Sequence, residues 1–400
     1  MIRSLRLGWV LVALVTLVAM SFAPGSHAGL GDKLKKKVTD KTDKTADDAL
    51  NKADAATKTG EEKTPDASGE EKAAAPGDAK GGEEKVSAVS TKFDFVPGDM
   101  VLFFDDFTQD ELGEFPANWK LMQGTLEVAE MNGQRWLRST SVESRFGMKI
   151  PAASALPEFW TLELDFYCGE PSGNVLNVSA LKGDKSVWTT TFPYSSQNAY
   201  FVSGKVTSNT PLESAKVWGA VHHVMFMARG TALKVYVDRQ RVANAPEIDP
   251  TNGSPDNFEI WLWSDKEPMI SNVRYAEGNK PVADPFAEGK LVTYGIYFDS
   301  GSDVVQPESA PVLRQIAAYM EKNAAVKVQI VGHTDNQGKA DENLDLSKRR
   351  SAAVAKVLSD QFKIAADRFK TDGMGDTKAV ADNAKAEGRA MNRRVEFTKI

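Results

Sequence analysis

The chain of 400 residues is too long for one hydrophobic core, and 42% hydrophobic with 26% charged residues is an ordinary globular composition. The net charge of −6 excludes a generally basic protein that coats nucleic acid, and the single cysteine excludes internal disulfides and thiolate-rich zinc sites. Aromatic residues are absent between Ala23 and Lys92, and every tryptophan except Trp9 lies between Trp119 and Trp263. The composition therefore divides the chain into an aromatic-free head, a tryptophan-rich middle and a tryptophan-free tail.

Residues 1–28 have the pattern of a signal peptide. Arg3 and Arg6 make the start positive, an apolar stretch runs to Met20, and Ser26-His27-Ala28 supplies small residues before a cleavage point. The apolar stretch is shorter than the roughly 20 residues that span a bilayer. We therefore expect Sec export, with an uncleaved membrane anchor as the alternative.

Residues 29–91 consist mainly of Lys, Asp, Glu, Ala, Gly and Thr. Such a segment buries too little apolar surface to offset the entropy lost on ordering. Leu30, Leu34 and Val38 follow a helical spacing, so a short helix is expected within an otherwise disordered linker.

The middle, residues 92–285, shows the alternation of β-strands. Leu162, Leu164 and Phe166 alternate with Glu163 and Asp165, so that apolar side chains face one side and acidic ones the other. Similar strand patterns occupy residues 100–104, 221–227, 233–237, 258–263 and 269–275. Turn residues separate them and no long helical pattern interrupts them, which predicts an antiparallel all-β sandwich of the jelly-roll kind.

Residues 221–242 resemble the "W-H-H-V" hairpin of laminin-G and concanavalin-like jelly rolls, with Val221-His222-His223-Val224 as its start. The resemblance implies a fold that commonly contacts carbohydrate. Trp261 and Trp263 share one side of a predicted strand and are a candidate glycan platform, because the CH faces of a pyranose pack on indole rings. The alternative is that both rings belong to the core.

Two other interpretations of the middle remain open. Alternation is also typical of an outer-membrane barrel, although these runs are shorter than the roughly 9–11 residues of a spanning strand. Alternatively the sandwich is a wall- or glycan-active hydrolase anchored by the tail, since Glu163 and Asp165 share a strand face and jelly-roll hydrolases use two carboxylates.

The tail, residues 286–400, alternates strands and helices. Strands are predicted over 291–298, 326–331, 368–371 and 394–400, and helices over 307–322 and 343–361. This order predicts an α/β domain with a mixed sheet.

Several spaced motifs in the tail match a known family in order. Gly332-His333-Thr334-Asp335-Asn336-Gln337-Gly338 is followed by Arg350 and later by a run from Gly388 to Glu396. Residues 288–400 closely resemble the OmpA-like C-terminal peptidoglycan-binding domain, which outer membrane protein A shares with peptidoglycan-associated lipoprotein and flagellar stator proteins. The resemblance implies binding to the diaminopimelate of the peptidoglycan stem peptide.

The residues themselves suit this ligand. Diaminopimelate ends in an ammonium and a carboxylate on one carbon, so a site needs an anion beside a donor fork. Asp335 lies in a turn after a buried strand, and Arg350 lies on the packed face of the next helix, four residues from both Leu346 and Val354. A guanidinium binds a carboxylate through two hydrogen bonds. The alternative is a structural salt bridge between Asp335 and Arg350.

The family pattern implies further binding residues around this pair: Thr334, Asn336, Phe298, Asp299, Asn343, Leu346 and Arg394. For Arg393 and Arg394, packing against an acidic neighbour such as Asp299 is an equal alternative. The four histidines have no metal-ligand spacing, and no catalytic or phosphate-binding motif occurs, so neither metal nor cofactor is expected.

Together these features predict a non-catalytic, peptidoglycan-binding protein of the Gram-negative cell envelope. We expect it in the periplasm, attached to the cell wall or the outer membrane, with no nucleic-acid partner. The middle is expected to be a second module that binds a glycan or an envelope protein.

Overall fold

The computed structural model describes residues 85–90, 92–150, 156–194, 197–212, 217–278 and 284–400. These residues belong to one compact unit. The expected signal peptide and the linker up to residue 84 lie outside the described residues. Within the described ranges, no helix is both long and apolar enough to cross a membrane.

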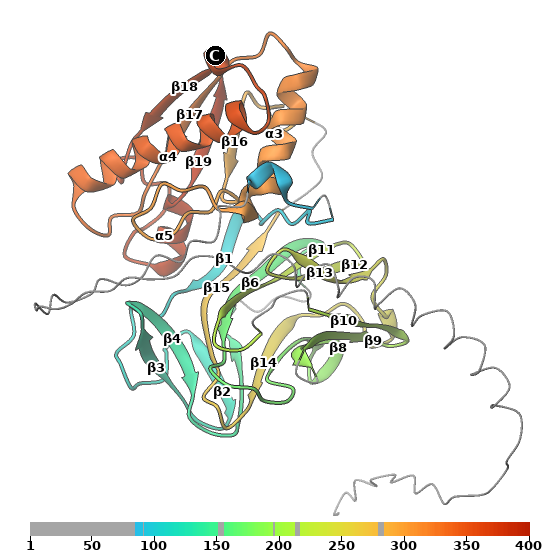
Figure 1. The fold of residues 1–400 in the computed structure, drawn as a ribbon. Helices are drawn as coiled ribbons and strands as arrows, with labels where there is room; N and C mark the ends of the chain where they lie inside the picture. Colours follow the sequence, from blue (N-terminus) through green and yellow to red (C-terminus); the bar gives the residue numbers. More distant parts are fainter. Residues whose placement is uncertain (1–84, 91, 151–155, 195–196, 213–216, 279–283) are drawn as a thin grey trace, which may run out of the picture. The chain divides into compact units, whose positions relative to one another are not determined.

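The middle of the chain forms two antiparallel sheets (Figure 1). The first sheet has the order β13-β12-β11-β6-β15-β4-β3, with β1 beside β15, and the second has the order β10-β9-β8-β7-β14-β5-β2. The strands are β1 (Met100–Asp105), β2 (Trp119–Gln123), β3 (Leu126–Met131), β4 (Gln134–Ser139), β5 (Glu143–Met148), β6 (Phe159–Tyr167), β7 (Leu176–Lys182), β8 (Lys185–Tyr194), β9 (Asn198–Ser203), β10 (Val206–Pro211), β11 (Val221–Arg229), β12 (Ala232–Val237), β13 (Gln240–Ala245), β14 (Asn257–Trp263) and β15 (Met269–Glu277). The predicted sandwich is confirmed, and each strand predicted from alternation is present.

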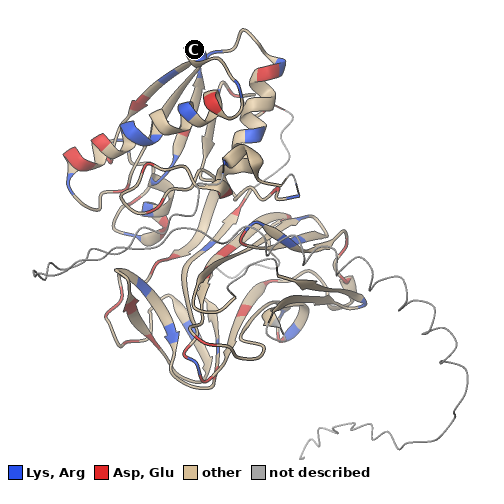
Figure 2. Cartoon of the chain, in the orientation of Figure 1, with Lys and Arg blue, Asp and Glu red and all other residues tan. Residues whose placement is uncertain are grey.

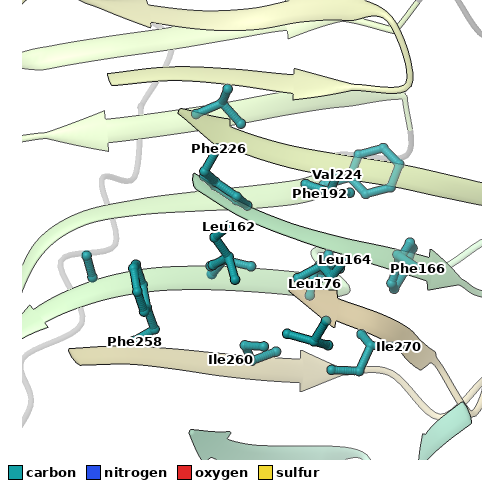
Figure 3. Close-up of a cluster of buried hydrophobic side chains, with 14 of the residues drawn as sticks. Leu162, Leu164, Phe166, Leu176, Phe192, Val224, Phe226, Phe258, Ile260 and Ile270 are labelled. Atoms are coloured by element: carbon teal, nitrogen blue, oxygen red, sulfur yellow. The ribbon is translucent and has the colours of Figure 1, made fainter. Parts of the chain in front are cut away.

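One apolar cluster joins the two sheets. Leu162, Leu164 and Phe166 of β6 and Phe226 of β11 point toward Ile260 of β14, as Figure 3 shows. All five side chains are inaccessible to solvent. Burial of this kind is worth roughly 1.5–3 kcal/mol for each large apolar side chain, so the alternating residues of both sheets supply the main stabilisation.

The opposite face of β6 holds a buried charge network. Glu163 is only 2% exposed, and its carboxylate lies 3.0 Å from Nη1 of Arg274 and 3.3 Å from Nε2 of His223. It also accepts a hydrogen bond from the hydroxyl of Tyr297 at 2.8 Å. Nδ1 of His223 lies 2.7 Å from Asp165. The two acids proposed as a catalytic pair are therefore held by partners on the sheet and in the tail.

The charges of this network support one another. Burial alone would raise the pKa of Glu163, but His223, Arg274 and Tyr297 together lower it. Burial alone would lower the pKa of His223, but hydrogen bonds and charges from Asp165 and Glu163 raise it to about 10. Both groups are thus ionised at neutral pH.

The tail is an α/β domain around one mixed sheet of order β16-β19-β17-β18, in which β17 and β18 run parallel (Figure 1). Its strands are β16 (Lys290–Thr293), β17 (Val328–Gly332), β18 (Phe369–Gly373) and β19 (Val395–Lys399), and its helices are α3 (Ala310–Lys322), α4 (Ala340–Asp360) and α5 (Ala386–Asn392). Four 3₁₀ turns complete the described elements: η2 (Val86–Ala88), η3 (Pro250–Asn252), η4 (Pro307–Ser309) and η5 (Ala366–Arg368). The predicted mixed sheet is confirmed.

Two details of the tail differ from the prediction. The strand predicted over 291–298 ends at Thr293, because the chain leaves the sheet at Gly295, where a Cβ would lie 2.6 Å from Val312. Beyond this point the amide of Tyr297 donates to Ser309 instead of to β19. Helix α5 was not predicted, since seven residues are too few for a periodic pattern.

The described residues include a folded segment that lies before the predicted sandwich boundary. Val86 and Val89, which fall in the expected linker, are buried in the apolar cluster of the tail, together with Phe93 and Phe95. Arg314 of α3 donates to the carbonyl of Val89 at 3.0 Å. The end of the linker is thus part of the folded protein.

We predict that the His223 network makes stability depend on pH. The folded-state pKa of about 10 exceeds the ordinary 6.5, so the stabilisation is complete below pH 6.5 and is lost as the pH rises through 10. The melting temperature of the full-length protein should therefore fall between pH 7 and 10. The variant His223→Gln should melt lower at pH 7 and show a flatter profile by calorimetry. Equal slopes of melting temperature against pH in the parent and in His223→Gln would contradict the assignment of this pH dependence to His223.

Candidate functional site

Helix α4 approaches the ends of β17 and β18 unusually closely. A Cβ on Gly332 would lie 2.3 Å from the carbonyl oxygen of Ser347, and one on Gly373 would lie 2.3 Å from the backbone nitrogen of Lys348. Ser347 is fully buried, and its Oγ accepts a 2.9 Å hydrogen bond from the amide of Gly375. The glycines at these strand ends therefore set the position of α4 relative to the loop that follows β17.

That loop carries Asp335 and is fixed on both sides. The amide of Thr334 donates to the carbonyl of Gly375 at 3.0 Å. Nδ2 of Asn343, in the first turn of α4, donates to the carbonyls of Asp335 and Gln337 at 3.3 and 2.9 Å. Asn343 thus fixes the shape of the loop.

Asp335 is 8% exposed and forms an ion pair that the sequence did not predict. Its Oδ2 lies 2.6 Å from Nη1 of Arg393, and its Oδ1 accepts from the amide of Gln337 at 3.1 Å. Arg393 follows α5 and lies over the ring of Phe104, 5.0 Å from its centroid. The expected alternative, a salt bridge between Asp335 and Arg350, does not form, because Arg393 takes that position.

Arg350 lies near Asp335 but is held by the main chain. Its Nε donates to the carbonyl of Ser302 at 2.8 Å and its Nη2 to the carbonyl of Asp299 at 3.1 Å. The guanidinium also covers the ring of Phe298, 4.8 Å from the centroid. Burial lowers the pKa of Arg350, and the charge of Asp335 opposes this shift. The two side chains predicted to bind the ligand are therefore electrostatically coupled without touching.

The other predicted residues differ in their exposure and in their hydrogen-bond partners. Leu346 is half-buried, Asn336 is exposed, and Thr334 is buried with an Oγ1 that has no hydrogen-bond partner in the described ranges. Asp299 lies in the segment after β16 and not at a strand end, and its carboxylate accepts from Gln306 at 2.8 Å. Arg394 is buried, and its Nε donates to Glu396 at 2.8 Å.

Arg394 therefore has a structural partner, although not the suggested Asp299. Its Nη1 and Nη2 donate to the carbonyls of Asn392 and Lys378 at 3.3 and 3.0 Å. Arg393 does pack against an acidic neighbour, but that neighbour is Asp335 of the candidate site and not Asp299. Arg393 directly follows α5, so its pairing with Asp335 could be predicted only by someone who already knew where that helix ends.

In the sandwich, Trp261 and Trp263 are outside the core. Their rings are stacked on each other at 5.4 Å and 8°, and Trp263 is 48% exposed. The guanidinium of Arg145 lies over Trp261, 5.8 Å from the ring centroid. The rings of Trp261 and Trp263 therefore stack face to face with Trp263 exposed, and they do not lie side by side as one flat platform. Among the described residues no cluster of His, Cys, Asp and Glu is arranged to hold a metal.

Comparisons with known proteins define the class of the tail. Residues 297–393 match the OmpA family. The chain is 32% identical over 138 residues to outer membrane protein A of Bordetella avium, a stretch that covers 34% of this chain and 71% of that protein. The chain therefore belongs to the OmpA family. Three other curated relatives are up to 38% identical, and the chain spans less than half of their length, 47%, 31% and 34%.

Two solved structures are similar to separate parts of the chain. The peptidoglycan-associated lipoprotein of Burkholderia pseudomallei is 29% identical, over 30% of this chain and 98% of that one, with a TM-score of 0.26. The carbohydrate-binding module CBM66 of Bacillus subtilis is 18% identical, over 40% of this chain and 96% of the module, with a TM-score of 0.30.

We predict that adding one methyl group at Gly332 destabilises the protein. The variant Gly332→Ala places a Cβ 2.3 Å from a backbone oxygen of α4, and overpacking of this kind costs about 1–3 kcal/mol. Gly173→Ala is the matched control, because nothing lies within 4 Å of its Cβ. Urea titration followed by circular dichroism should show the loss only for Gly332→Ala. Equal urea midpoints for Gly332→Ala and Gly173→Ala would mean that α4 can move away from the added methyl group.

Proposed function

We propose that this protein binds peptidoglycan non-covalently through its tail, by recognising the diaminopimelate of the stem peptide. The observation that carries the proposal is the arrangement of Asp335 and Arg350, a carboxylate and a guanidinium that interact electrostatically but are each held by other partners. Membership of the OmpA family supports peptidoglycan as the partner, and the choice of diaminopimelate rests on the site itself.

Asp335 has capacity left for an ammonium group. An ionised carboxylate has about four acceptor positions, and Gln337 and Arg393 use two of them. The guanidinium of Arg393 offsets the negative charge of this nearly buried carboxylate. The ammonium of the diaminopimelate side chain is expected to bind here.

Arg350 supplies the complementary donors. Its Nε and Nη2 are used by two carbonyls, whereas Nη1 donates to none of the described residues. These two bonds and the ring of Phe298 hold the guanidinium in one orientation, which reduces the entropy lost on binding. We expect Nη1, together with amides of the Thr334–Gly338 turn, to bind the carboxylate of the ligand.

For the rest of the chain we propose a supporting role. The protein acts after Sec export, in the periplasm of a Gram-negative cell, and the sandwich is a second module that binds a glycan or an envelope protein. A binding role is favoured over a hydrolase because Glu163 and Asp165 are committed to His223 and Arg274. Two modules on one chain increase overall affinity when both bind at once.

We predict that Asp335→Ala and Arg350→Ala each abolish sedimentation of the full-length protein with purified diaminopimelate-type sacculi. Loss of one partner of a desolvated charge pair costs about 3–5 kcal/mol, because the remaining charge stays buried and unpaired. The full-length protein is the appropriate sample, since Phe104 contacts Arg393.

Matched controls lie on the same helix. Asp345 and Arg349 form an exposed ion pair on α4, where acidic and basic residues are interspersed (Figure 2). Asp345→Ala and Arg349→Ala should bind sacculi like the parent protein. Unchanged binding by folded Asp335→Ala and Arg350→Ala would show that the wall contact lies elsewhere.

A further inference from the structure

The outer face of the second sheet holds a groove with a volume of about 750 Å³, within the range typical of ligand pockets. Two rows of side chains cross it, as the strand register shows. Thr189, Ser179 and Glu259 form one row across β8, β7 and β14. Asn177, Trp261 and Arg145 form the next row across β7, β14 and β5.

The polar groups of the groove are fixed by one another. Oγ of Ser179 lies 2.8 Å from Oγ1 of Thr189, which lies 3.0 Å from Oγ of Ser186. The amide oxygen of Asn177 accepts from Thr191 at 2.7 Å, which orients its NH₂ group. Hydroxyl and amide groups that are ordered before binding lose little entropy when a ligand arrives.

A charged pair lines the groove. Nη2 of Arg145 donates to both carboxylate oxygens of Glu259, at 2.9 and 2.8 Å, and the Glu259 side chain is 11% exposed. Arg145 and Trp261 both line the groove, and each has a buried nitrogen, Nε of Arg145 and Nε1 of Trp261, with no hydrogen-bond partner in the described ranges. Buried donors without partners are rare in proteins, so both favour a ligand rich in acceptors.

The groove does not suit a peptide bound as an added strand, or a polyanion. A peptide bound by strand addition needs a free sheet edge, whereas β7, β14 and β5 each have strands on both sides. Lys120 and Arg145 balance Asp184 and Glu259 among the lining residues, so the groove has no excess charge to attract a charged polymer.

We propose that this groove binds a neutral pyranose oligosaccharide. The hydroxyl groups of a sugar are donors and acceptors, which matches the Ser, Thr and Asn side chains of the two rows and the Glu259–Arg145 pair. At the Trp261 end of the groove, the exposed ring of Trp263 offers a face for the CH groups of one sugar unit. The inference rests on the proposed role of the sandwich as a second binding module and names its ligand class.

Titration calorimetry of the full-length protein tests this assignment. The probes are three soluble hexasaccharides without stem peptide: β-1,4-linked glucose, β-1,4-linked N-acetylglucosamine and α-1,4-linked glucose. At least one should bind. Trp263→Ala should weaken it about tenfold through the lost ring contact, and Glu259→Gln roughly 10- to 100-fold through the lost charged hydrogen bonds.

Leu112→Ala is the control, because this side chain is 53% exposed and does not line the groove. Its affinity, and that of Asp335→Ala, should equal that of the parent. Three results would overturn the assignment. They are no binding of any hexasaccharide at millimolar concentration, an affinity of folded Trp263→Ala and Glu259→Gln equal to that of the parent, or the release of new reducing ends from a hexasaccharide. If no hexasaccharide binds while sedimentation with sacculi still requires Asp335, the groove assignment falls and the function of the tail stands.

Discussion

The geometry of the tail depends on the contact between α4 and the glycine ends of β17 and β18. Backbone atoms of Ser347 and Lys348 occupy the space that side chains of Gly332 and Gly373 would fill. Because α4 is fixed there, Asn343 reaches the Asp335 loop and Arg350 reaches the carbonyls of the segment after β16. A shift of α4 by the size of a methyl group would separate all of these contacts at once.

The same kinds of charged group serve different purposes in the two parts of the protein. Glu163 is surrounded by Arg274, His223 and Tyr297, so these side chains of the protein itself occupy its acceptor positions. Asp335 is nearly as buried but keeps unused acceptor positions beside Arg350. A buried charge is weak evidence for stability or function until its partners have been counted.

The sequence predicted the elements whose side chains alternate strictly and missed those whose pattern is weaker. Strands such as β6 and β14 have one apolar and one polar face, whereas β8 and β10 carry Thr and Ser on both faces and have no clear period. The early end of β16 depends on Val312 and Pro97, which are distant in sequence from Gly295. Such tertiary contacts leave no local pattern.

For the site, the motif predicted Asp335, Arg350 and Asn343, because each occupies a fixed distance from the end of a predicted element. It did not predict that Arg393 pairs with Asp335, since that pairing depends on where the short helix α5 ends. The Trp261 and Trp263 pair shows the same limit. Alternation placed both rings on one face, but only the register with Arg145, Asn177 and Ser179 shows that this face is a groove of fixed hydroxyl and charged groups.

The proposed modules would thus recognise different chemistry, charge pairs in the tail and hydroxyl groups in the sandwich. Salt therefore screens mainly the first of them, since charge–charge attraction weakens with ionic strength and ring stacking does not.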